Sequence, residues 1–70
     1  CRGIASELMN GLITTARSHG FHSMIARIAD SQEASIALHR SLGFELVGVE
    51  REVGRKFNRW LDVSVMQLLL

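Results

Sequence analysis

Residues 1–6, Cys-Arg-Gly-Ile-Ala-Ser, have the clearest chemical use in this chain. Because Gly3 and Ala5 carry almost no side chain, an anion such as a phosphate can approach the backbone N–H groups there. A helix that starts at the same place adds partial positive charge at its N-terminus. The pattern predicts an anion-binding turn that leads into a helix. A plain N-terminal turn is the alternative that the residues alone leave open.

The composition excludes several other kinds of site. The chain has 70 residues, 47% of them apolar, and a formal net charge of +1, which predicts at most one domain and no solvated, disordered segment. A single cysteine excludes an internal disulfide. The cysteine and the histidines do not have the spacing of a structural zinc site. The charge argues against a nucleic-acid partner, and no apolar run is long enough to cross a membrane. No signal peptide is present in these residues.

The element that follows the turn is a helix from residue 3 to about residue 19. Apolar residues recur there every four positions and form one stripe, namely Ile4, Leu8, Leu12 and Ala16, with Met9 and Ile13 beside them. Gly20 suits the left-handed position that ends a helix.

A strand and a second helix follow. Residues 21–29 are apolar and short, which predicts a strand, parallel and central in a sheet. Asp30–Ser31 with Glu33 resembles a capping box at the start of a helix over residues 32–41. Gly43 is expected to end that helix.

The remaining residues have the two-residue period of strands. One strand runs from Phe44 towards Val53, residues 54–59 form a polar turn region, and residues 60–70 form a second strand. Two strands around such a turn predict an antiparallel hairpin. The predicted fold class is therefore α/β, with the order α-β-α-β-β and a mixed sheet.

Several segments together resemble the C-terminal half of a domain of the GNAT superfamily of N-acetyltransferases. Gly3-Ile4-Ala5 matches part of the family's Arg/Gln-x-x-Gly-x-Gly/Ala motif, whose leading residue would precede Cys1. Ser-Ile-Ala-Leu-His at 35–39, Leu-Gly-Phe at 42–44 and the stretch 51–63 resemble the phosphinothricin and methionine sulfoximine acetyltransferase branch. The Lys-Phe-x-Arg-Trp-Leu-Asp run within that stretch is the most specific of these patterns.

The resemblance implies an acetyl-coenzyme A site that is built from two segments. Backbone amides of the first segment would cradle the pyrophosphate, namely those of Cys1, Arg2, Gly3, Ile4, Ala5 and Ser6. The Arg2 side chain would contact a coenzyme phosphate, with a solvated arginine as the alternative. Ser35 would lie near the coenzyme, or serve only as a small helix residue. Gln32 replaces the Asn usual in this branch, so its contact to the cofactor would reach one methylene further.

His39 stands where many relatives carry the tyrosine proposed to protonate the leaving thiolate. A positioned histidine can do this as a general acid. The alternative is a histidine that packs beside Leu42 or caps a carbonyl. Cys1 is not expected to act as a nucleophile, because the superfamily transfers the acetyl group directly, without a covalent enzyme intermediate.

The resemblance also implies what these residues lack. The general base for the amine and the sheet edge that polarises the thioester are expected mainly in the preceding half of the family's fold. We therefore expect residues 1–70 to be a partial domain with little or no activity alone. The expected substrate is the amine of a small amino-acid-like molecule such as phosphinothricin or methionine sulfoximine. Self-association, most simply as a homodimer, and a cytoplasmic location are further expectations.

Two rival functions stay open. The first is a non-catalytic coenzyme A-binding or oligomerising remnant of such an enzyme. The second is a small nucleic-acid-binding module, which the near-balance of basic and acidic residues makes the weaker rival.

Overall fold

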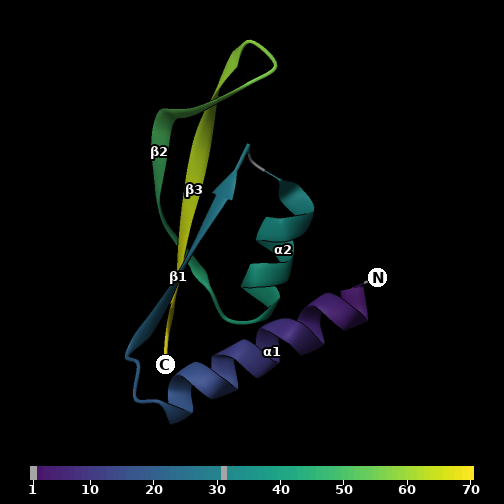
Figure 1. The fold of residues 1–70 in the computed structure, drawn as a ribbon, viewed down its shortest axis with the longest axis vertical. Coiled ribbons are helices and arrows are strands. Elements are labelled where there is room, and N and C mark those ends of the chain that lie inside the picture. The colour runs from purple at the N-terminus through teal and green to yellow at the C-terminus, as the bar shows by residue number, and fades with distance from the viewer. Residues whose placement is uncertain (1, 31) are drawn as a thin grey trace.

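The computed structural model describes residues 2–30 and 32–70. In chain order they form α1 (Arg2–Ser18), β1 (Ser23–Ala29), α2 (Glu33–Ser41), β2 (Glu45–Lys56) and β3 (Arg59–Leu69). The predicted order α-β-α-β-β is confirmed. Both helices lie beside a twisted sheet of three strands, from which the hairpin of β2 and β3 projects (Figure 1).

The sheet differs from the predicted one in its pairing. The strand order is β1-β3-β2, and both pairs are antiparallel, so the sheet is not mixed and β1 is an edge strand of these three. The helix between β1 and β2 does leave these two strands pointing the same way, as a crossover connection should. Because β3 lies between them and bonds to both, they never pair. Within these three strands, β1 is therefore neither central nor parallel to its neighbour, contrary to the expectation for residues 21–29.

The start of α2 also differs from the prediction. Gln32 is the N-cap residue, and its side chain makes no capping hydrogen bond. Asp30 has a positive φ of 61°, and its carboxylate accepts a hydrogen bond from Arg59 at 2.6 Å. The predicted capping box of Asp30 with Glu33 is therefore absent, because the carboxylate that would cap the helix is engaged by β3. Ser31, the other half of that prediction, lies outside the described residues.

The end of α2 agrees with the prediction. Gly43 has a φ of 99° and donates its N–H to the carbonyl of Arg40 at 3.0 Å. The N–H of Phe44 reaches the carbonyl of His39, also at 3.0 Å. These two bonds form a Schellman motif, which satisfies carbonyl groups that the helix leaves free at its C-terminus. Gly20 ends α1 with the same pair of bonds.

The hairpin turn is tighter than the sequence predicts. Lys56 pairs with Arg59, so the loop contains only Phe57 and Asn58. Both have positive φ, 51° and 61°, as a two-residue type I′ turn requires. The predicted turn region at 54–59 is therefore mostly strand.

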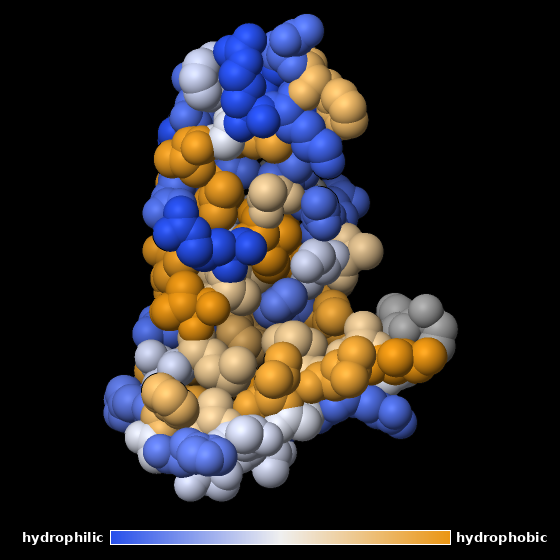
Figure 2. Space-filling model, in the orientation of Figure 1, coloured by the Kyte–Doolittle hydropathy of each residue, from blue (hydrophilic) through white to orange (hydrophobic). Residues whose placement is uncertain are grey.

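The core lies between the two helices and one face of the sheet. Its buried members are Ile13, Ile28, Phe44 and Met66. The apolar stripe of α1 is only partly used, because Met9 and Ile13 face the core, whereas Ile4, Leu8 and Leu12 remain exposed. These exposed side chains contribute to the hydrophobic band along α1 in Figure 2.

Candidate functional site

A groove of about 770 Å³ lies between the first turns of α1 and one side of α2. Small side chains line it from both helices, namely Gly3, Ala5 and Ser6 of α1 and Ala34, Ser35, Ala37, Leu38 and Ser41 of α2. Seven of these eight are glycine, alanine or serine. The walls therefore leave the backbone close to the surface, so a ligand can reach it.

The α1 side of the groove is suited to an anion. In a helix that begins at Arg2, the N–H groups of the first turn have no partner within the helix. The helix dipole adds positive potential at the same end. A Cβ placed on Gly3 would meet nothing within 4 Å, so no packing within the described chain accounts for the missing side chain. The turn expected before the helix is itself helical, so Ala5 and Ser6 contribute chiefly by their small size.

The structure brings together four of the nine residues that sequence and resemblance single out. Gly3, Ala5, Ser6 and Ser35 line the groove from its two sides. Ile4 is 61% exposed and is not among the lining residues. Gln32 is exposed at the N-cap of α2. Of the other two N-terminal candidates, Cys1 lies outside the described residues, and Arg2 is described only as the first residue of the helix.

His39 packs against the core residue Phe44 and is not among the residues that line the groove. Its Nδ1 lies 2.7 Å from the carbonyl oxygen of Ser35, and since a carbonyl can only accept, Nδ1 is the donor. The ring packs edge-on against Phe44, with 5.1 Å between the ring centroids. Only Nε2 is therefore left for other chemistry.

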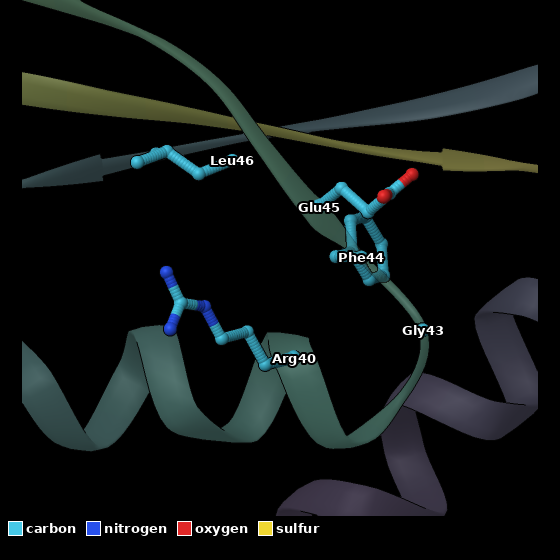
Figure 3. A pocket seen from close by; sticks show the side chains of 5 residues that line it. All are labelled: Arg40, Gly43, Phe44, Glu45 and Leu46. Carbon is cyan, nitrogen blue, oxygen red and sulfur yellow. The ribbon is translucent and has the colours of Figure 1, made fainter.

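A second hollow, of about 660 Å³, lies between the end of α2 and the start of β2. It is lined by Arg40, Gly43, Phe44, Glu45 and Leu46, and the Arg40 side chain extends from the helix towards the strand (Figure 3). No motif in the sequence predicts this hollow, because its residues have the pattern of a helix end and a strand start. None of the predicted site residues belongs to it.

Three acidic groups on the sheet side have arginine partners, and none of the three lines the groove. Asp30 pairs with Arg59, Asp62 lies 3.6 Å from Arg51, and Glu50 pairs with Arg27.

In residues 2–30 and 32–70, no group of His, Cys, Asp and Glu could hold a metal ion. Within the same residues, no helix is long and apolar enough to cross a membrane. None of the described residues that line the groove carries a carboxylate that could act as a base.

Comparison with known proteins points to one family. A family described as "Acetyltransferase (GNAT) domain" matches residues 1–65. The L-methionine sulfoximine/L-methionine sulfone acetyltransferase of Pseudomonas aeruginosa is 49% identical over 69 residues, which are 99% of this chain and 40% of that protein. The phosphinothricin N-acetyltransferase of Streptomyces coelicolor is 46% identical over 63 residues, 90% of this chain and 37% of that protein.

Solved structures agree with these matches. A phosphinothricin acetyltransferase from Sinorhizobium meliloti, in complex with AcCoA, is similar with a TM-score of 0.92 and 46% identity. The match covers 97% of this chain and 37% of that one. A Ribosomal-protein-alanine N-acetyltransferase from Brucella melitensis gives a TM-score of 0.93 at 50% identity, covering 97% and 42%. The chain spans about 40% of the length of the first curated relatives that it matches.

Proposed function

The chain belongs to the GNAT family of acetyltransferases, and we propose that it is the acetyl-coenzyme A-binding part of an N-acetyltransferase. One observation carries the proposal: the groove between the N-terminus of α1 and α2 is walled almost entirely by glycine, alanine and serine. A pyrophosphate needs both close access to backbone N–H groups and a favourable potential, and the first turn of α1 supplies both. The residues proposed to hold it are residues 1–6.

The α2 side would hold the remainder of the cofactor. Ser35 faces the groove from the first turns of that helix. Gln32 ends in an amide and stands exposed at the helix start, where it can donate to or accept from a polar cofactor group. In the proposed reaction the substrate amine forms a C–N bond to the carbonyl carbon of the thioester and gives up one proton to a base outside the groove. The C–S bond then breaks, and coenzyme A leaves as a thiolate that takes up a proton.

We propose His39 as the donor of that proton, through Nε2. Nδ1 is already bonded to the Ser35 carbonyl, so Nε2 carries a proton only when the ring is protonated on both nitrogens. The bond at Nδ1 and the contact with Phe44 would hold the ring in a single orientation. The neutral ring would accept a hydrogen bond at Nε2 and could not act as the acid.

The substrate class that we propose is a small amino acid or amino-acid analogue, because relatives at 46–49% identity are named for methionine sulfoximine, methionine sulfone and phosphinothricin. We expect these 70 residues alone to bind acetyl-coenzyme A without turnover, since the groove offers no base. A cytoplasmic location follows as a proposal from the availability of acetyl-coenzyme A there.

A matched pair of glycine variants tests the cofactor site. Acetyl-coenzyme A is titrated calorimetrically into the chain and into Gly3→Asp and Gly11→Asp. Both glycines lie on α1, with nothing within 4 Å of an added Cβ, but only Gly3 lines the groove. An aspartate at a helix N-terminus favours the helix, so a rise in Kd of about ten-fold or more in Gly3→Asp would reflect repulsion of the pyrophosphate. Equal affinity in all three proteins would refute the site.

Catalysis needs a separate test. In a chimaera, the preceding part of the Pseudomonas aeruginosa relative is joined to these 70 residues and assayed for acetylation of methionine sulfoximine. Acetyl transfer by the chimaera, with none by the isolated chain, would support the proposal that these residues bind the cofactor and that the preceding part completes the catalytic site. Turnover by the isolated chain at the rate of the intact relative would contradict it.

A non-catalytic, oligomerising remnant is the second candidate. The exposed apolar side chains of α1 favour it, because Ile4, Leu8 and Leu12 are 58–66% exposed and lie one helical turn apart. Such a stripe suits packing against a second copy in a homodimer. Helical ellipticity per residue that grows in magnitude with protein concentration would support this candidate. Sedimentation as a monomer at every concentration would exclude it.

A further inference from the structure

Asp30, at the start of the link between β1 and α2, is held in an unusual conformation by bonds from β3. Asp30, the first residue after β1, has a φ of 61°, which aspartate tolerates better than most residues but which still costs free energy. Its N–H donates to the carbonyl of Asp62 at 2.9 Å. Its carboxylate Oδ2 accepts from Nη2 of Arg59 at 2.6 Å. Backbone and side chain of the same residue are thus fixed by one strand.

The same stretch of β3 also holds the hairpin. Arg59 is the first residue of β3 after the two-residue turn. Three residues later, Oδ1 of Asp62 accepts the N–H of Glu52 at 2.9 Å. Glu52 has a φ of 54° and lies where the register of β2 against β3 shifts. Residues 59–62 therefore join the irregular part of β2 on one side to the link before α2 on the other.

We propose that Arg59 is a positioning residue for the groove: through Asp30 it fixes where α2 begins, and so where Gln32 and Ser35 stand opposite the first turn of α1. This inference rests on the proposed acetyl-coenzyme A site and extends it to a residue outside the groove. An exposed ion pair contributes little to global stability. Its effect here is local, because it holds a left-handed residue two positions before the N-cap of α2.

A second ion pair of the same kind serves as the control. Arg27 of β1 pairs with Glu50 of β2, and its two side chains are 60% and 38% exposed, against 58% and 38% for Arg59 and Asp30. The Arg27 pair links β1 to β2 across β3, and neither of its residues belongs to a helix. Loss of either pair removes a similar surface interaction, but only loss of the Arg59 pair frees the carboxylate of Asp30.

The experiment measures binding and local opening in the 70-residue chain. Arg59→Gln, Asp30→Asn, the double variant and Arg27→Gln are titrated with acetyl-coenzyme A. Asparagine also tolerates a positive φ, so Asp30→Asn removes the charge without forcing the backbone. We expect Kd to rise about five-fold in each of the first two variants and no further in the double variant, because the residues act through each other. Arg27→Gln should stay within about two-fold of the original chain.

Hydrogen exchange without ligand gives the second measurement. The N–H of Ile36 bonds to the carbonyl of Gln32 at 3.0 Å and closes the first turn of α2. It should exchange faster in Arg59→Gln and Asp30→Asn and at the original rate in Arg27→Gln. Unchanged exchange in the first two variants would overturn the inference, whatever the chain binds.

The two measurements separate the inference from the function on which it rests. Faster exchange at Ile36, in a chain that does not bind acetyl-coenzyme A, would leave α2 positioned by Arg59 and overturn the proposed cofactor site. Weaker binding in Arg59→Gln with unchanged binding in Asp30→Asn would overturn the positioning role. That result would place the guanidinium on the ligand itself.

Discussion

The two glycines that end the helices allow a quantitative test of the fold. Gly20 has a φ of 82° and Gly43 a φ of 99°, both favourable only for glycine. Alanine at either position should cost about 1–2 kcal/mol for the left-handed backbone. At Gly20 the new Cβ meets nothing within 4 Å, whereas at Gly43 it would approach Cδ1 of Leu68 to 3.2 Å. Moving that side chain adds about 0.5–1 kcal/mol.

Urea unfolding followed by far-ultraviolet circular dichroism measures the difference. We expect the free energy of unfolding to fall by about 1 kcal/mol in Gly20→Ala and by about 2 kcal/mol in Gly43→Ala, with unchanged m-values. An equal loss would show that Leu68 moves aside at no cost. No loss in either variant would refute the left-handed helix ends altogether.

Two further predictions concern the groove and the core. Ala37→Phe should fill the groove and raise the calorimetric Kd for acetyl-coenzyme A about ten-fold or more. Thr14→Phe is the control and should leave Kd unchanged, because Thr14 is exposed and lies outside the groove. Equal affinities of the two variants would show that the ligand binds elsewhere. Phe44→Ala removes a ring that is 3% exposed and should lower the free energy of unfolding by about 3–5 kcal/mol in urea titrations. A loss below about 1 kcal/mol would mean that Phe44 is not part of the core.

The elements could be predicted because each has a local cause. The helical period of α1, the glycines at both helix ends and the two strands of the hairpin all appear in the structure. The strand order could not be predicted in this way. The position of β3 between β1 and β2 depends on pairing between segments far apart in the chain, and local periodicity contains no information about which strands pair.

Part of the groove lining can be predicted from small residues at a helix start. The residue types and spacing single out Gly3, Ala5 and Ser6, the resemblance singles out Ser35, and all four line the groove. The start of α2 was mispredicted for a definite physical reason. Asp30 has the side chain of a helix cap, but Arg59, 29 residues away, provides an oppositely charged partner that takes up the same carboxylate. Competition between a local cap and a distant ion pair cannot be judged without the fold.

A path of contacts through His39 connects the groove to the core. Phe44 is buried with Ile13, Ile28 and Met66, and its N–H closes the end of α2 on the carbonyl of His39. The ring of His39 packs against Phe44, and its Nδ1 holds the carbonyl of Ser35, whose residue lines the groove. Because each of these contacts is directional, the core fixes the rotation of α2 as well as its distance from the sheet. The small residues of α2 therefore face α1 as a consequence of packing on the far side of the same helix.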